Sequence, residues 1–257
     1  VEQNVAAGLS GDKKKKQERT EKMIRHFRLE GLEKRFPRQL SGGQQQRAAL
    51  ARIMAYEPSV ILLDEPFSAL DVFLKDRLQQ EMMELLSDYE GTVILVSHSR
   101  DEIYRFSEEL LVIDDGKQIC YGDTKAIFDR PGRVEAARLT GCKNIVPVDR
   151  LDAHRLQIPD WDTELVLEQK IDPEITHIGI RAHEFIPVWG ERKKNCIPVR
   201  VNGKAEFPFE WKYFLKSAGK ESDDICWYVQ KTMWQELAEK GIPDYLWLPE
   251  KEILLLR

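Results

Sequence analysis

The sequence predicts an α/β fold in its first part and a smaller β-rich region after it. Two short apolar runs, residues 60–63 and 92–96, flank a helix-forming segment, residues 74–89. A strand, a crossover helix and a second strand form a right-handed βαβ unit, and a continuous apolar run is typical of a strand buried on both faces of a parallel sheet. Beyond Gly141 the apolar runs are short and often separated by Pro or Gly, which favours a small barrel or sandwich.

The composition limits the class of protein. The 257 residues are 42% apolar and 32% charged, which is ordinary for a chain with a hydrophobic core. No run approaches the ~18 apolar residues of a membrane span, and the chain start shows no signal-peptide pattern. The four cysteines form no C-x-x-C pair, so a zinc site or a disulfide framework is poorly supported and a reducing compartment fits best.

The charge is uneven along the chain. The net charge of −5 argues against general nucleic-acid binding, yet residues 12–38 hold eleven Lys and Arg against five Asp and Glu. The run of lysines from Lys13 to Lys16 is best read as a solvated helix start or loop. A contact of this segment with a membrane-protein partner or an anionic lipid stays open.

The first elements follow from spacing and from chain breakers. Residues 15–30 carry apolar side chains at helical spacing, and Gly31 and Pro37 then interrupt the chain. Residues 44–55 are rich in helix formers and contain no breaker, so a helix should begin at Ser41 to Gly43.

The later elements are mostly strands. Residues 110–113 and 118–121 flank Asp115-Gly116, which predicts a hairpin, and a helix is expected at about 124–128 before Pro131-Gly132. Further strands are expected at 165–167, 177–181, 197–201, 225–230 and 253–256, with one helical insertion at 232–240.

Four motifs in a fixed order carry the functional signal. They are Leu40-Ser41-Gly42-Gly43-Gln44-Gln45-Gln46-Arg47, Asp64-Glu65-Pro66, Ser68-Ala69-Leu70-Asp71 and His98. Each motif alone is weak, but the ordered series resembles the ATP-binding cassette (ABC) ATPases. The resemblance implies a P-loop-type α/β ATPase domain with a helical subdomain, and ATP and Mg²⁺ as cofactors.

Three residues of these motifs are expected at one edge of the sheet. Asp64 and Glu65 end the first strand and His98 follows the second, where open α/β sheets bind ligands. By the resemblance, Asp64 helps to hold Mg²⁺ and Glu65 is the catalytic carboxylate that polarises the attacking water. His98 resembles the catalytic switch histidine, whose imidazole bonds the γ-phosphate.

The other predicted binding residues are those that would face the nucleotide held by a partner subunit. Ser41, Gly42, Gly43 and Gln44 open a helix, and a glycine-rich helix start is an anion-binding arrangement. In the family this surface faces the nucleotide of the opposite subunit, so the resemblance implies a homodimer with ATP between two cassettes. Asp71 resembles the residue that crosses the dimer interface, although it can equally cap the following helix.

One expected part of an ATPase is missing from the sequence. The chain has no Gly-x-x-x-x-Gly-Lys-[Ser/Thr] phosphate loop, and it opens on Val1. We therefore expect the C-terminal portion of a longer cassette, truncated at its N-terminus, with no appreciable ATPase activity of its own. A protein that naturally lacks the loop is the other possibility.

The β-rich extension is similar to that of one group of importers, which includes the maltose, sulfate, polyamine and molybdate systems. Residues 96–105, 134–144 and 178–183 are most similar to molybdate-type members. Such a subunit works under a transmembrane permease at the cytoplasmic face of the membrane and receives its solute indirectly from a periplasmic or extracellular binding protein.

The expected division is a partial nucleotide-binding domain at residues 1–140, with a helical subdomain at about 1–45, and an accessory domain of TOBE or OB type at 141–257. Arg181 and His183 could bind an oxyanion there. Pairing with neighbouring acids such as Glu184 is the preferred interpretation.

Other classes remain open. A DNA-repair or chromosome-structure ATPase shares the Ser-Gly-Gly motif but has long heptad arms, which this sequence lacks. A translation-associated protein would carry two cassettes. An importer ATPase for sulfate, sugar or polyamine, or a non-hydrolytic regulatory or dimerisation fragment, are the alternatives to a molybdate importer.

Overall fold

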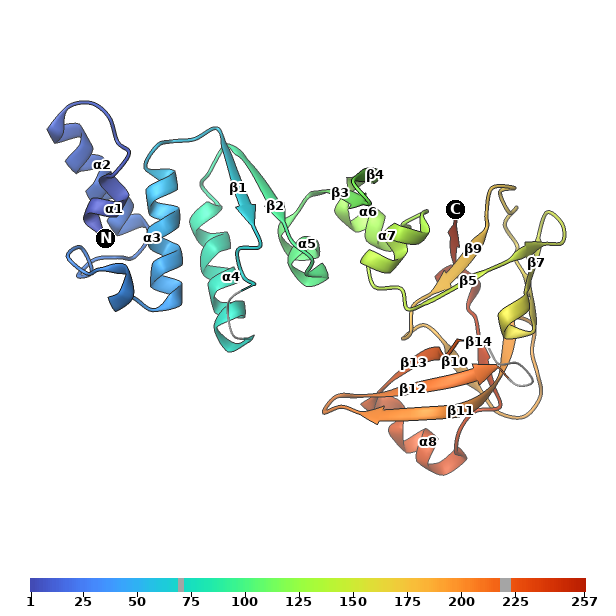
Figure 1. The fold of residues 1–257 in the computed structure, drawn as a ribbon. Coiled ribbons are helices and arrows are strands. Elements are labelled where there is room, and N and C mark those ends of the chain that lie inside the picture. The colour runs from blue at the N-terminus through green and yellow to red at the C-terminus, as the bar shows by residue number, and fades with distance from the viewer. Residues whose placement is uncertain (69–71, 218–222) are drawn as a thin grey trace. The chain divides into compact units, whose positions relative to one another are not determined.

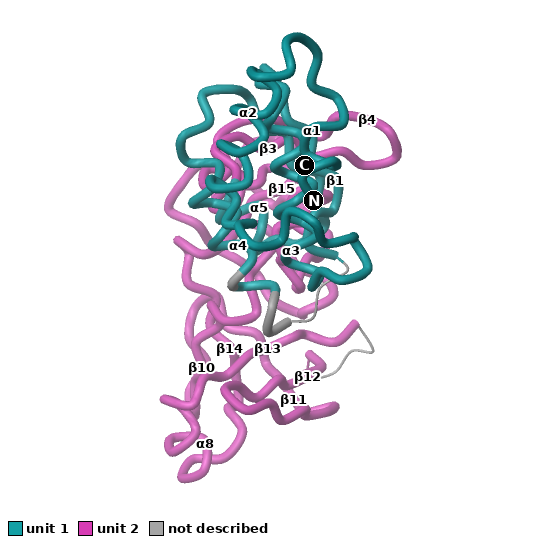
Figure 2. The backbone as a smooth tube through the Cα atoms, turned by 90° about the vertical axis from the view of Figure 1, so that its left-hand side faces the viewer, with its two compact units in different colours: residues 1–106 teal, residues 107–257 magenta. Residues whose placement is uncertain are grey.

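The computed structural model describes residues 1–68, 72–217 and 223–257. At residues 72–74 and 77 it describes the backbone alone. The chain divides into two compact units, residues 1–106 and 107–257 (Figure 2). The division expected from the sequence, at 140/141, stays a prediction.

Unit 1 alternates helices with two strands (Figure 1). Its elements are α1 (Glu2–Ala6), α2 (Lys13–His26), η1 (Pro37–Gln39), α3 (Gly42–Met54), β1 (Val60–Asp64), α4 (Val72–Leu86), β2 (Thr92–Val96) and α5 (Arg100–Phe106). The helices around 15–30, 44–55 and 74–89 and both strands were predicted, and they are confirmed within a few residues. Asp12 caps α2 and Ser41 caps α3, each by accepting a backbone N–H with its side chain.

The two strands of unit 1 form the predicted βαβ unit. β1 and β2 pair in parallel, with Leu62 opposite Ile94 and Asp64 opposite Val96. A parallel pairing needs a crossover connection, and α4 lies in that connection. The carboxyl ends of both strands therefore meet at one edge.

The prediction that these strands are buried on both faces is wrong for the described residues. Ile61 is 1% exposed and belongs to a core with Phe27, Leu50 and Phe67, whereas Leu62 is 64% exposed and Ile94 48% exposed. Side chains alternate across a strand, so only the face of Ile61 is covered within unit 1. A continuous apolar run does not by itself show what covers its second face.

Unit 2 begins with a hairpin and two helices. β3 (Glu109–Asp114) and β4 (Lys117–Asp123) pair antiparallel, and α6 (Thr124–Asp129) and α7 (Val134–Leu139) follow. Asp115 and Gly116 both have positive φ, 45° and 70°, as the predicted two-residue turn requires. The sequence did not predict α7.

The rest of unit 2 is rich in antiparallel sheet. The strands are β5 (Asn144–Pro147), β6 (Asp149–Arg150), β7 (Arg155–Ile158), β8 (Thr163–Val166), β9 (His177–Ile180), β10 (Ile186–Val188), β11 (Cys196–Glu206), β12 (Glu210–Ser217), β13 (Ile225–Gln230), β14 (Tyr245–Trp247) and β15 (Leu254–Leu256). They form sheets in the orders β10-β14-β11-β12-β13, β15-β9-β5 and β6-β7-β8. Short helices at η2 (Pro159–Trp161), η3 (Lys231–Met233), α8 (Trp234–Lys240) and η4 (Glu250–Glu252) connect them.

One buried core holds this sheet-rich part together. It contains Trp161, Ile178, Leu215, Trp227 and further residues from all three sheets. Asn144 adds a polar link: its side chain donates to the carbonyls of Ile180 and Cys226 and accepts from the amide of Cys226, at 3.1, 2.9 and 2.7 Å. The predicted sheet-rich part is thus confirmed. Among the described helices of both units, none is long and apolar enough to cross a membrane.

Candidate functional site

Glu65 lies directly after β1, at the carboxyl edge of the parallel pair. Its amide donates to the carbonyl of Val96 at 2.9 Å, and its own carbonyl accepts from the amide and hydroxyl of Ser68 at 3.2 and 3.0 Å. These bonds hold Glu65 at a φ of 44°, a left-handed conformation that is uncommon for this residue type. Strained backbone of this kind is concentrated at active sites and ligand clamps.

His98 follows β2 and contacts the same carboxylate. Its Nδ1 lies 2.7 Å from Oε1 of Glu65, and its backbone amide donates to that oxygen at 3.0 Å. Because an ionised carboxylate only accepts, Nδ1 carries the hydrogen and Nε2 is left for another partner. The side chain of His98 is 83% exposed. The structure brings together the two residues predicted as catalytic, and their catalytic roles stay predictions.

Asp64 is the last residue of β1 and its side chain is exposed. Mg²⁺ prefers oxygen ligands and is often held by one or two carboxylates together with substrate phosphates. No cluster of three or more His, Cys, Asp or Glu suited to a metal occurs among the described residues. Asp64 offers one exposed carboxylate of the kind that Mg²⁺ prefers, and its role as a Mg²⁺ ligand stays a prediction.

The start of α3 is built as predicted. The hydroxyl of Ser41 accepts from the amide of Gln44 at 3.3 Å, and Oε1 of Gln44 accepts from the amide of Ser41 at 3.0 Å. This capping box satisfies one amide of the first turn. The amides of Gly42 and Gly43 belong to the same turn, which has no partners within the helix. They are the donors that a bound anion would meet.

The three glutamines of this motif have separate roles. Gln44 closes the capping box, Gln45 donates to the carbonyls of Pro37 and Leu40, and Gln46 donates to the carbonyl of Pro66 at 2.9 Å. The last bond connects α3 to the residue that follows Glu65. The motif therefore also holds α3 against the segments that precede it and follow β1, which was not predicted from the sequence.

Gly43 has a packing role as well. A Cβ added at Gly43 would lie 2.7 Å from Cδ2 of Leu78 on α4. A side chain at position 43 would therefore force the tip of the Leu78 side chain to shift, whether or not the backbone meets a phosphate. Asp71, predicted at the dimer interface, lies outside the described residues.

The residues that fix the loop of His98 were not predicted from the sequence. Glu102 on α5 is 2% exposed and bonds Ser97, the residue before His98, and Lys75 on α4. Its only signal is an acidic residue four positions after His98, on a short helix that also carries one exposed acid, Asp101.

Arg181 and His183 do not form an oxyanion site. Arg181 donates to the carbonyl of Thr140 at 2.8 Å and to that of Phe128, so its guanidinium is used within unit 2. The expected pairing with Glu184 is not what holds Arg181. His183 lies 3.4 Å from Glu210 and packs edge-on against Tyr228.

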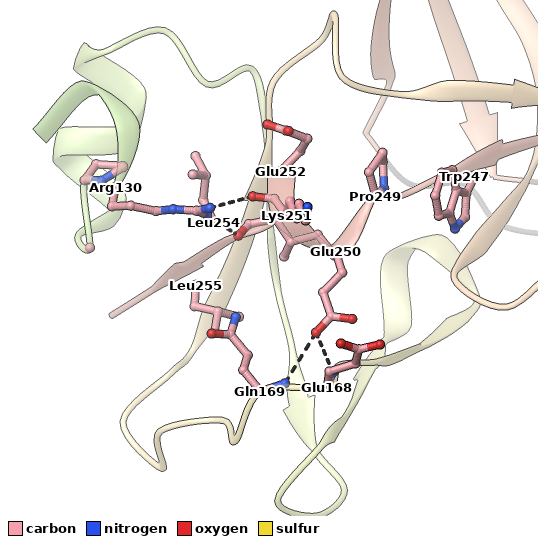
Figure 3. Close-up of a pocket in the computed structure, with 13 residues that line it drawn as sticks. Arg130, Glu168, Gln169, Trp247, Pro249, Glu250, Lys251, Glu252, Leu254 and Leu255 are labelled. Atoms are coloured by element: carbon pink, nitrogen blue, oxygen red, sulfur yellow. Dashed lines mark hydrogen bonds between the residues drawn. The ribbon is translucent and has the colours of Figure 1, made fainter. Parts of the chain in front are cut away.

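A pocket of 820 Å³ lies in unit 2 near the C-terminal strand (Figure 3). Two of its charged side chains are engaged: Arg130 donates to the carbonyls of Lys251 and Ile253 at 2.5 and 3.1 Å, and Glu250 accepts from the amides of Glu168 and Gln169. The pocket contains none of the predicted catalytic or nucleotide-binding residues. No ligand class follows from it.

The comparisons with known proteins agree with the motifs. The family model described as "ABC transporter" matches residues 1–68, which include the Ser41 motif, Asp64 and Glu65. The match supports the prediction of an ABC transporter ATP-binding subunit over residues 1–68.

Three curated relatives are named as ATP-binding proteins of import or transport. The Fe(3+) ions import ATP-binding protein FbpC of Haemophilus influenzae (strain 86-028NP) is 39% identical, over 61% of this chain and 46% of the relative. The putrescine transport protein PotG of Escherichia coli (strain K12) is 38% identical over 57% and 39%, and the sulfate/thiosulfate protein CysA of Synechocystis sp. (strain ATCC 27184 / PCC 6803 / Kazusa) 37% over 57% and 42%. The chain thus spans less than half of the length of each of these three relatives.

A solved ABC transporter structure of the metal-chelate type, in an inward-facing conformation, is 26% identical with a TM-score of 0.44, over 49% of this chain and 53% of that chain. The three curated relatives are named for iron, putrescine and sulfate or thiosulfate. The molybdate type therefore stays a prediction.

Proposed function

We propose that this chain is part of the ATP-hydrolysing subunit of an ABC importer. The observation that carries the proposal is the pair of Glu65 and His98, joined at 2.7 Å at the carboxyl edge of the two parallel strands. The match to residues 1–68 and the importer names of the relatives support it. The whole protein would act as a homodimer beneath a transmembrane permease, at the cytoplasmic face of the membrane, with a solute-binding protein on the other side.

Glu65 has the role of the catalytic carboxylate in this proposal. Phosphoryl transfer depends on positioning and charge stabilisation, and a carboxylate that orients a water and accepts its proton supplies both. The backbone of Glu65 bonds Val96 and Ser68, and these bonds fix the position from which the carboxylate extends. The pairing with His98 then orients it towards the carboxyl edge of the sheet.

His98 would bind the γ-phosphate through Nε2. Because Nδ1 already donates to Glu65, Nε2 can donate to a phosphate oxygen only when the ring carries a second proton. In the neutral ring Nε2 accepts instead, and the ring would have to turn to bond the phosphate.

ATP and Mg²⁺ are the cofactors of the proposed reaction. Asp64 would hold Mg²⁺, which supplies charge neutralisation of the phosphates when bound. Ser41, Gly42, Gly43 and Gln44 would contact the nucleotide of the partner cassette through the first turn of α3. Asp71 would cross between the two cassettes.

The phosphate loop has to come from another segment. These residues alone are expected to show no appreciable ATPase activity, because nothing in the sequence cradles the α- and β-phosphates. The exposed apolar side chains of Val60, Leu62, Ile94 and Val96 give a loop-bearing segment a face to pack against. We propose a cassette that reaches to about residue 140, followed by an accessory domain of TOBE or OB type.

The cargo is proposed from similarity alone. The strings at 96–105, 134–144 and 178–183 favour molybdate or a related oxyanion, while the relatives named above are iron, polyamine and sulfate proteins. Arg181 and His183 supply no argument for an oxyanion, since both are engaged within unit 2. In such importers other chains select the solute.

The test is ATP hydrolysis by the chain joined to an N-terminal segment that bears a phosphate loop, with the unmodified chain as the matched control. The proposal predicts Mg²⁺-dependent turnover in the joined protein only, and a raised Mg²⁺ requirement in an Asp64→Asn version. A joined protein that binds ATP and never hydrolyses it, even with a permease, would favour a regulatory or dimerisation fragment.

A further inference from the structure

Glu102 is a buried carboxylate outside the predicted site. It lies on α5, four residues after His98, and is 2% exposed. Burying a charge is costly unless it is paired and hydrogen-bonded. Its partners therefore show what the charge holds in place.

Both oxygens of Glu102 are engaged. Oε1 lies 2.6 Å from Nζ of Lys75 and 3.4 Å from Nε2 of Gln79, both on α4, and Oε2 lies 2.6 Å from the hydroxyl of Ser97. Burial pushes the pKa of Glu102 up, but the hydrogen bonds from Lys75 and Ser97 outweigh it and the pKa is lowered overall. The carboxylate is thus ionised at neutral pH.

The direction of each bond around Ser97 follows from this charge. An ionised carboxylate only accepts, so the hydroxyl of Ser97 donates to Glu102. The same hydroxyl oxygen then accepts the amide of Ser99 at 3.0 Å. The residues on both sides of His98 are tied to one fixed hydroxyl.

We propose that Glu102 and Ser97 are positioning residues that hold His98 within reach of Glu65. The connection runs from Lys75 on α4 through Glu102 and Ser97 to the backbone of His98. The amide of His98 and its Nδ1 then meet Oε1 of Glu65. This inference rests on the proposed function, because it concerns the same pair of residues.

A purely structural role makes a different prediction. If Glu102 only fastens α5 to α4, loss of the Ser97 hydroxyl would change the stability of these helices and leave His98 where it is. If the hydroxyl positions His98, its loss would release the loop without unfolding the helices. Ser97 separates the two cases, whereas removal of the buried Glu102 risks unfolding unit 1.

The first experiment uses the 257-residue chain and three versions: wild type, Ser97→Ala and Ser97→Thr. Amide hydrogen exchange at His98 and the NMR signal of its imidazole Nδ1 are measured, with exchange in α3 as the check on folding. We expect exchange at the His98 amide to rise at least about tenfold in Ser97→Ala, as the loss of a bond to a charged group implies, and to return in Ser97→Thr, which keeps the hydroxyl. Unchanged exchange and Nδ1 signals in a folded Ser97→Ala protein would overturn the proposal.

The second experiment uses the protein joined to a phosphate-loop segment. Ser97→Ala should lower kcat with KM for ATP little changed, and Ser97→Thr should restore kcat. A Ser97→Ala protein with wild-type kcat would overturn the positioning role. If instead Glu65→Gln hydrolyses ATP like the wild type, the proposed function fails, while the exchange result at His98 still decides whether Ser97 orders the loop.

Discussion

Oε1 of Glu65 receives two hydrogen bonds from a single residue, His98, whose amide lies 3.0 Å and whose Nδ1 lies 2.7 Å away. The carboxylate is therefore bonded from the loop that follows the second strand, β2. The imidazole is 83% exposed, so it adds little buried surface to unit 1.

His98→Ala should separate function from stability. Removal of an exposed side chain is expected to change the free energy of unfolding of unit 1 by less than about 0.5 kcal/mol, while ATP turnover of the loop-joined protein falls about a hundredfold. Hydrogen exchange in α3 and α4 measures the first quantity and a steady-state assay the second. If the loss of ATP turnover is accompanied by a comparable loss in the free energy of unfolding, His98 has a structural role.

Glu102→Gln should change the response of unit 1 to acid. The folded pKa of Glu102 is below its ordinary value of 4.5, so the carboxylate stabilises the fold above that pH, and the contribution is lost as pH falls through the folded pKa. At neutral pH we expect the variant to be less stable by about 1–3 kcal/mol.

The difference between wild type and Glu102→Gln should shrink as the pH is lowered through 4.5 and below. The measurement is exchange in α4 and α5 as a function of pH. A difference that stays constant down to pH values well below the ordinary pKa would contradict the ion pair as its source.

Asn144→Ala should destabilise unit 2. Asn144 is 4% exposed, and its loss leaves the amide of Cys226 and the carbonyl of Ile180 without this partner. The expected cost is about 2–4 kcal/mol, since each unsatisfied buried group costs about 1–3 kcal/mol. All six tryptophans of the chain lie at or beyond Trp161, so their fluorescence reports the unfolding of unit 2.

The matched control is Asn202→Ala. Its side chain donates to Asp224 at 2.9 Å on the exposed part of the sheet. A change below about 0.5 kcal/mol is expected there. If the two variants unfold at the same midpoint, as followed by tryptophan fluorescence, the hydrogen bonds of Asn144 do not stabilise unit 2.

Gly43→Ala should destabilise the packing of α3 on α4. Alanine favours a helix by about 1 kcal/mol, but the new Cβ at 2.7 Å from Cδ2 of Leu78 forces repacking that costs about 1–3 kcal/mol. A double-mutant cycle with Leu78→Ala tests the cause: Gly43→Ala should cost less once Leu78 is truncated. If the two substitutions have additive effects on the free energy of unfolding, the cost of Gly43→Ala does not come from contact with Leu78.

Much of unit 1 could be predicted from the sequence because the signals there are local. Ser41 is a capping residue before a breaker-free helix, and the runs at 60–63 and 92–96 are short, apolar and joined through a helix. The edge shared by Glu65 and His98 follows from parallel pairing alone. The exposure of Leu62 and Ile94 could not be predicted, because it depends on what packs against the strands.

The misses have physical causes. β12 alternates Trp211, Tyr213 and Leu215 with charged or large residues, a period-two signal that the lysines obscured. Arg181 bonds two carbonyls distant in sequence, where the nearby Glu184 had suggested an ion pair. The bonds of Glu102 join α4, α5 and the loop that follows β2, so no local pattern shows them.

The central claim is that Glu65 is the catalytic carboxylate of an ABC importer ATPase. The most direct measurement is ATP turnover by the loop-joined protein and its Glu65→Gln version, with ATP binding measured in parallel. The account predicts that Glu65→Gln binds ATP with similar affinity and loses at least about a hundredfold in kcat. Wild-type turnover in the Glu65→Gln protein would contradict it.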